Sequence, residues 1–306
     1  MIRNFKDKDM KEIISLWNRC MPYNQITERE FIKSILLDMN FDPKGVFVYE
    51  KDKQIKGFIY ATKRKVPIDV NADLESNKGW IVAISVDKEE FEIAPQLIKK
   101  AEEFINNEYN RTIYACSYTP NYFYQGINTK YEDYVKLFND MGYTVAETNC
   151  SMKVDLTKYT TPDFISSLKE KLENEGITFK KLSYENITSY LTFQKPSWAH
   201  RFRRLLNENM DFNQISVAIY DNEVIGCNIF GDPHSEKERF GPFGVRDDFQ
   251  GKGIGKILLD DCLSEMKKRG LKYAWMQSSS AAEHVVKLYK KFGFEVTGEY
   301  INYFKN

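Results

Sequence analysis

The two halves of the chain follow one plan, and this constrains the fold more than any other feature. Each half opens with a short strand and a helix, and continues with two strands around a polar turn. An apolar strand then leads into an amphipathic helix, and a similar phrase closes each half, at Lys136–Tyr143 and at Lys287–Phe294. Agreement in this order at four places indicates a duplicated domain.

The duplication predicts two domains within 306 residues. We place the first at residues 1–157 and the second at residues 177–306. Between them, residues 158–176 contain Thr-Thr-Pro-Asp followed by a polar stretch that ends at Gly176. These are helix start and stop signals, so a linker helix is expected there.

A β-hairpin is expected near the start of each half. Apolar residues alternate on both sides of Asp52-Lys53, and they do so again around Asp221-Asn222. Alternation with a polar turn between the two runs is typical of paired antiparallel strands.

Charge and composition disfavour several classes of partner. Lys+Arg and Asp+Glu both number 44, so the basic excess of a nucleic-acid binder or of a polybasic membrane protein is missing. The sequence has no run of about 18 apolar residues and begins with charged residues. The five cysteines are scattered without a C-x-x-C pair, which favours reduced thiols over disulfides or zinc. We expect a cytoplasmic protein with no nucleic-acid or membrane partner and no metal.

The most informative stretch is a glycine-rich turn between an apolar strand ending at Val245 and a helix expected from Ile254 to Lys268. Helix N-termini leave backbone N–H groups unpaired at the positive end of the dipole. Glycines let the backbone approach a bulky anion, and two lysines add charge. The predicted diphosphate cradle comprises Gln250, Gly251, Lys252, Gly253, Ile254, Gly255 and Lys256.

Three kinds of phosphate loop can be compared with this turn. A dinucleotide fingerprint needs G-x-G-x-x-G, which the turn lacks. A P-loop needs glycine at 250 and Ser or Thr at 257, where the chain has Gln250 and Ile257. What remains is Q-x-x-G-x-G, with Gln250, Gly253 and Gly255. This resembles the acetyl-CoA signature of the GNAT (GCN5-related N-acetyltransferase) family.

The resemblance implies an α/β fold for each half: a mixed, largely antiparallel twisted sheet flanked by helices, whose two central parallel strands splay apart where the pantetheine arm enters. By the same resemblance, the main chain of Phe243, Gly244 and Val245 contacts the pantetheine and polarises the thioester carbonyl. Tyr289 matches the family's tyrosine beside the thioester sulfur, where a phenol can protonate the leaving thiolate. The alternative for Tyr289 is a core aromatic.

No residue type identifies the general base. Glu238 lies where several GNAT enzymes carry a glutamate, but its charged neighbours favour a solvated turn. His200 could line the acceptor cleft or belong to a solvated basic helix face. His234 and His284 are isolated histidines, which are more often surface or core residues. The stretch 278–284 lacks the family's asparagine, which leaves contacts along the pantetheine arm open.

The first half lacks the chemistry of the second. Where the second has its glycine turn, the first has Glu92-Ile-Ala-Pro-Gln-Leu-Ile, and where the second has Tyr289, the first has Phe138. The first half is therefore interpreted as a degenerate copy. Its aromatic stretch Tyr118–Gly126 is either a binding surface or a packed loop.

The resemblance implies transfer of an acetyl group from acetyl-CoA, as co-substrate, to a primary amine of a small molecule or peptide. A non-catalytic acyl-CoA-binding or scaffold protein is the alternative. A third hypothesis, an aminoacyl-tRNA-using ligase with paired GNAT-like domains, agrees less well with a neutral chain. Neither the acceptor amine nor the oligomeric state has a signature in the sequence.

Overall fold

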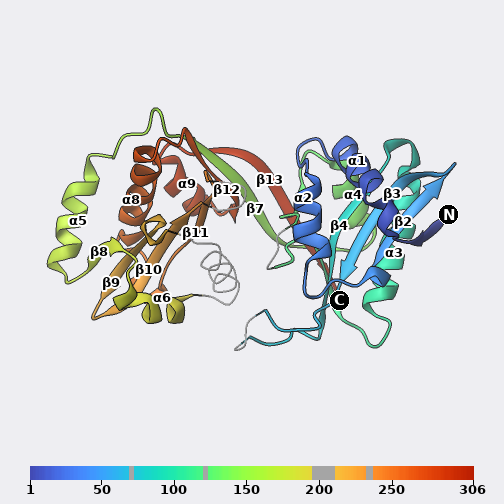
Figure 1. The fold of residues 1–306 in the computed structure, drawn as a ribbon, viewed down its shortest axis with the longest axis horizontal. Coiled ribbons are helices and arrows are strands. Elements are labelled where there is room, and N and C mark those ends of the chain that lie inside the picture. Colours follow the sequence, from blue (N-terminus) through green and yellow to red (C-terminus); the bar gives the residue numbers. More distant parts are fainter. Residues whose placement is uncertain (69–71, 120–122, 195–210, 232–236) are drawn as a thin grey trace. The chain divides into compact units, whose positions relative to one another are not determined.

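The computed structural model describes residues 1–68, 72–119, 123–194, 211–231 and 237–306 (Figure 1). The chain divides into two compact units: Met1–Asn149 with Glu299–Asn306 form unit 1, and Cys150–Gly298 form unit 2. This division differs from the predicted ranges 1–157 and 177–306. The reason is that two long strands, β7 (Thr144–Asp155) and β13 (Glu295–Lys305), each begin in one unit and end in the other.

Unit 1 is built on a mixed sheet. Its described neighbouring strands pair antiparallel, except for the parallel pair β4 and β5. In spatial order its strands are β1 (Ile2–Asn4), β2 (Val46–Lys51), β3 (Gln54–Thr62), β4 (Lys78–Val86), β5 (Thr112–Ala115), the end of β13 and the first half of β7, with β6 (Ile127–Asn128) also paired to β13. Its helices are α1 (Met10–Cys20), α2 (Glu28–Phe31), α3 (Ala94–Ile105) and α4 (Glu132–Asp140).

The core of unit 1 lies where α1 and α3 pack on β3 and β4. Each helix turns an apolar stripe inward: Ile13, Leu16 and Trp17 are buried on α1, and Leu97 and Ile98 are buried on α3. Apolar residues three and four apart fall on one helical face, so this spacing is what places the helices against the sheet.

The last residues of the chain complete the sheet of unit 1. Tyr303 pairs with Ala115 and Lys305 pairs with Ile113, both antiparallel. The ring of Tyr303 is buried and stacks on Phe138 with centroids 5.5 Å apart. The end of β13 is therefore a core strand of unit 1, although it follows unit 2 in sequence.

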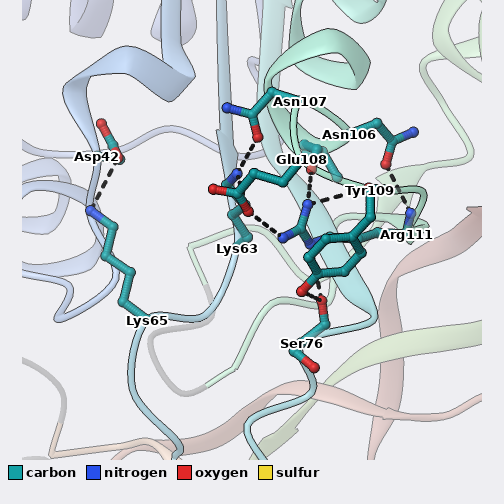
Figure 2. A network of polar contacts seen from close by, with 10 residues as sticks. Asp42, Lys63, Lys65, Ser76, Asn106, Asn107, Glu108, Tyr109 and Arg111 are labelled. Carbon is teal, nitrogen blue, oxygen red and sulfur yellow. Dashed lines mark hydrogen bonds and ion pairs between the residues drawn. The ribbon is translucent and has the colours of Figure 1, made fainter.

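A buried arginine closes the end of α3 (Figure 2). The Arg111 guanidinium donates to the carbonyl oxygens of Ile105 (2.5 Å) and Ser76 (3.0 Å), and to the Glu108 carboxylate (2.8 Å). It also lies 3.8 Å from the ring centre of Tyr109. A cation at a helix C-terminus satisfies carbonyls that have no intrahelical donor and complements the dipole. Arg111 thereby fixes the turn between α3 and β5.

The described part of unit 2 has a four-stranded antiparallel sheet and a strand pair that continues the longer sheet through β13. The sheet runs β8 (Thr178–Lys181), β9 (Ile215–Tyr220), β10 (Glu223–Phe230) and β11 (Phe240–Val245), and the pair is β12 (Tyr273–Ser280) beside the second half of β7. Its helices are α5 (Phe164–Asn174), α6 (Ile187–Phe193), α8 (Ile254–Lys268) and α9 (Glu283–Lys290).

Short turns of other helical types also occur. Residues Ile32–Leu36 extend α2 as a π-helical turn, and the 3₁₀ turns are Asp7–Asp9, Pro43–Gly45, Lys88–Ile93, Tyr184–Asn186, Phe212–Gln214 and Asp247–Phe249.

Both predicted hairpins are present, as β2–β3 and β9–β10. Their two-residue turns are Asp52-Lys53 and Asp221-Asn222, and all four residues have positive φ, from 49° to 62°. This left-handed backbone matches the twist of the flanking strands, and Asp and Asn tolerate it well. The predicted α/β fold class, with sheets flanked by helices, is confirmed.

The predicted linker segment forms α5, but this helix is part of unit 2 and packs against α8. Its buried residues Ile165 and Leu172 join the core of that unit.

Within the aromatic stretch Tyr118–Gly126 of unit 1, the described aromatic residues Tyr118, Phe123 and Tyr124 are buried, so this part is packed. No helix in the described ranges is long and apolar enough to span a membrane.

Candidate active site

The two sheets of unit 2 separate between β11 and β12. In the described residues these strands share a single parallel bridge, Arg239 with Trp275. There the backbone N–H of Trp275 donates to the backbone carbonyl of Glu238 (3.0 Å). Beyond that bridge, β11 pairs only with β10 among the described strands. One edge of β11 is therefore left without a neighbour, as the family resemblance implied for the central strands.

The open edge of β11 presents backbone donors. Arg246 donates its N–H to the Ile225 carbonyl of β10 (2.8 Å). Backbone groups alternate in direction along a strand, so the N–H of Val245 points the other way, as does that of Phe243 two residues earlier. Gly244, between them, pairs with Cys227. The strand can thus donate to a ligand that lies along this edge.

The glycine turn opens α8 as predicted, with Ile254 as the first helical residue and Lys268 as the last. Gly251 and Gly253 have φ of 79° and 101°. The first hydrogen bond of the helix runs from the Lys256 N–H to the Gly253 carbonyl (2.9 Å). Within the described ranges, the backbone N–H groups of residues 251–255 have no acceptor, which is the usual state of a helix N-terminus. Free N–H groups at a helix N-terminus can bind an anion.

Two glycines of the turn lie close to neighbouring side chains. A Cβ on Gly253 would lie 3.0 Å from Leu168 of α5, in addition to the cost of its positive φ. A Cβ on Gly255 would lie 3.1 Å from the Phe243 ring. The side chain of Ile254 is buried in the core, so only its backbone is available to a ligand. The sequence pattern here follows from close packing of the turn.

The polar side chains of the turn divide into two roles. Gln250 donates to the Val245 carbonyl (3.1 Å) and to Asp247 (2.8 Å), so it ties the turn to the end of β11. The ammonium groups of Lys252 and Lys256 lie over the rings of Phe249 (4.8 Å) and Phe164 (5.6 Å). Among the residues that the structure describes, neither lysine has a carboxylate partner. Both charges are available to an anion, and the turn fits the diphosphate of coenzyme A.

Tyr289 is buried on α9 among aromatic rings. Its ring centre lies 5.4 Å from that of Phe294, 6.1 Å from Phe240 and 6.2 Å from Phe243, the residue on the open edge of β11. Burial raises the pKa of the phenol well above its ordinary value, and a hydrogen bond with Ser279 acts in the opposite direction. The phenol therefore keeps its proton through the physiological pH range.

The structure describes two of the four remaining candidate residues. Glu238 is half-buried at the start of β11, and His284 is exposed on α9. His200 and His234 lie outside the described residues. In the described ranges, no three His, Cys, Asp or Glu side chains gather as a metal site would require.

Sequence reasoning missed three polar side chains near the splay. Arg239 donates to the side chain of Gln277 on β12 (2.8 Å). Ser279, two residues further along the same strand, has a side chain that favours a lower pKa of the Tyr289 phenol. The alternation of Gln277 and Ser279 along one strand face was a readable signal, but only the fold brings them to β11 and α9.

The family match falls within unit 2. Residues 183–294 match the family model "Acetyltransferase (GNAT) family". A curated relative, mycothiol acetyltransferase from Propionibacterium freudenreichii subsp. shermanii, is 37% identical over 60 residues, which are 20% of this chain and 19% of the relative. The similarity therefore covers about a fifth of either protein.

Solved structures resemble the whole chain. The GCN5-related glucosamine N-acetyltransferase region of a fungal multi-domain GH3 β-N-acetylglucosaminidase matches with a TM-score of 0.79 at 16% identity, covering 100% of this chain and 38% of that one. A GCN5-related N-acetyltransferase from Sphaerobacter thermophilus matches at 0.73 and 15%, covering 100% and 95%. A tandem GNAT protein from the clavulanic acid pathway matches at 0.63 and 10%, covering 100% and 98%. At these identities, the matches show a shared tandem fold.

Proposed function

This chain carries a GNAT-family acetyltransferase domain at residues 183–294, and from that premise we propose that it transfers the acetyl group of acetyl-CoA to a primary amine of a small molecule or peptide. The observation that carries the proposal is the turn at residues 250–256. Among the described residues it combines backbone donors without acceptors, two lysines without carboxylate partners, and two glycines with positive φ. Free N–H groups are usual at a helix N-terminus, so it is the glycines and the two lysines beside those groups that favour an anion here.

The residues of the chain supply three parts of the chemistry. The turn binds the diphosphate and so positions the thioester of the co-substrate. The N–H groups on the open edge of β11, at Phe243 and Val245, donate to the thioester carbonyl oxygen, where negative charge develops; donors of this kind are worth about 3 kcal/mol each. As the amine nitrogen bonds to the carbonyl carbon and the C–S bond breaks, Tyr289 gives its phenolic proton to the departing sulfur. The nitrogen loses one proton to solvent as the amide forms, and solvent returns a proton to the Tyr289 phenolate.

A protein that binds acyl-CoA without turning it over is the competing proposal. Steady-state release of free thiol from acetyl-CoA, measured against a panel of small amines and short peptides, separates the two. An enzyme gives amine-dependent thiol release with at least one acceptor. A binding protein gives none, while calorimetry still detects binding of acetyl-CoA.

We propose a cytoplasmic location for this activity, because none of the five cysteines forms a disulfide.

We further propose that unit 1 is a copy that does not bind coenzyme A. Its strand β4 ends at Val86 and leads into α3, as β11 ends at Val245 before α8. The Val86 N–H, which corresponds to the open donor of unit 2, donates instead to the hydroxyl of Tyr134 (2.8 Å). Tyr134 is buried on α4 against Phe91, with ring centres 5.0 Å apart. At the same place in α9, unit 2 has Val285, which is too short to reach a backbone donor in this way.

Titration of the full chain with coenzyme A is therefore expected to give one binding site per chain. The segment that replaces the glycine turn in unit 1, at residues 92–98, contains Glu92 and Pro95 and offers no glycine. Isothermal calorimetry measures the stoichiometry directly. A second site of comparable affinity, or one site that survives charge reversal of Lys252 and Lys256, would contradict the assignment to unit 2.

A further inference from the structure

Helix α5 lies outside the family match at residues 183–294, yet it contacts the diphosphate-binding turn. Leu168 on this helix occupies the space that a Cβ on Gly253 would need (3.0 Å). The helix also packs along α8, the helix that the turn opens. The segment predicted as a linker therefore packs against one side of the turn.

The first residue of α5, Phe164, has an exposed aromatic ring close to this contact. Phe164 is 39% exposed, although the neighbouring positions Ile165 and Leu168 are turned toward the core of the unit. One edge of the ring is held by Phe292, at 6.3 Å and nearly perpendicular. The Lys256 ammonium from the first turn of α8 lies 5.6 Å from the ring centre. The ring is thus held in place by Phe292 while much of its surface stays open to solvent.

We propose that Phe164 is a stacking platform for the adenine ring of the coenzyme A nucleotide. This inference rests on the proposed function, because it assumes that the turn binds the diphosphate. The thioester end of the ligand runs from the turn toward the open edge of β11 and Tyr289. The nucleotide end must leave the turn elsewhere, and Phe164 lies beside the first turn of α8, on the contact that α5 makes with Gly253. An open aromatic face next to an unpaired ammonium suits a base that carries phosphates.

The test compares ligands with and without the adenosine. We expect Phe164→Leu to weaken binding of acetyl-CoA and of adenosine 3′,5′-bisphosphate by about ten- to hundredfold, the usual effect of losing one base–aromatic stack. Binding of S-acetyl-4′-phosphopantetheine, which lacks the base, should not change. Phe164→Tyr keeps the ring and should bind all three ligands as the parent protein does.

Tyr184 provides a matched control, because it is an exposed aromatic residue of unit 2 that packs on Phe212 instead. Tyr184→Leu should leave all three affinities unchanged, and thermal unfolding of each variant checks that the fold is intact. If Phe164→Leu binds acetyl-CoA and the bisphosphate as tightly as the parent, the platform is refuted while the proposed function stands. If the parent protein binds neither ligand, both proposals fall. Equal weakening toward the phosphopantetheine donor would also refute the platform, because the loss would then lie in the turn.

Discussion

Replacement of Tyr289 by phenylalanine is expected to lower kcat by about ten- to a thousandfold, the scale of general acid catalysis. The hydroxyl is the only group removed, and the ring keeps its contacts with Phe240, Phe243 and Phe294. KM for acetyl-CoA should therefore change little. The measurement is kcat for the parent and the variant on the same acceptor at saturating acetyl-CoA.

Tyr159 is the matched control for that experiment. Its hydroxyl is also buried in unit 2, where it donates to the Asp260 carboxylate of α8 (2.6 Å). Tyr159→Phe should reduce stability by about 1.5–3 kcal/mol, the usual value of a hydrogen bond to a charged group, without lowering kcat. Equal kcat for the parent and Tyr289→Phe would make Tyr289 a packing residue.

The pH dependence of the parent enzyme gives an independent check on Tyr289. Burial raises the pKa of this phenol well above its ordinary value near 10. Because the protonated form is the active one, a raised pKa keeps the acid competent into alkaline solution, and no loss of kcat from this group is expected below about pH 10. A decline in kcat near neutral pH that Tyr289→Phe abolishes would contradict this assignment.

Charge reversal of both lysines in the turn is expected to weaken acetyl-CoA binding by about a hundredfold or more. A hydrogen bond to a charged group is worth about 1.5–3 kcal/mol, and the variant Lys252→Glu/Lys256→Glu loses two such interactions and adds repulsion. Isothermal calorimetry at low and at moderate salt measures the effect, which salt should reduce.

Lys268→Glu is the control, because this exposed lysine lies at the other end of the same helix. It changes the net charge by two units, as either single substitution in the turn does, and should bind acetyl-CoA as the parent does. Unchanged affinity in the double variant would show that the turn does not hold the diphosphate. Substitutions at Gly253 are less informative, since its φ of 101° and its contact with Leu168 would strain the fold as well.

Local patterns predicted most of the secondary structure. The bounds of α8 agree at both ends, because an apolar stripe of helical period begins after a glycine turn and ends at lysines. Both hairpins were readable from alternation around polar turns. The unit boundary was not readable, because β7 has an unbroken strand pattern across residues 149 and 150, and nothing local shows which sheet each half joins.

The candidate site was predictable to the extent that a motif specifies it. The turn and Tyr289 were identified from residue types and spacing, whereas the contacts that support them are tertiary. Tyr134 accepts a hydrogen bond from the backbone of Val86, Ser279 influences the pKa of Tyr289, and Phe164 lies beside Lys256 of the turn only because helices or strands distant in sequence pack together. Lone residues of these types on helices and strands are usually packing residues, so sequence alone gave no reason to select them.

The end of β13 has a consequence for how the protein is made. A chain emerging from a ribosome presents residues 1–149 first, but the sheet of unit 1 also needs Tyr303 and Lys305 beside β5. Until β13 has been synthesised, β5 lacks its neighbour on one edge and the ring of Phe138 lacks its stacking partner. Unit 1 therefore completes its fold only after unit 2 has been synthesised. Loss of unit 2 by a simple shortening of the gene would also remove a core strand from unit 1, which ties the retention of each unit to that of the other.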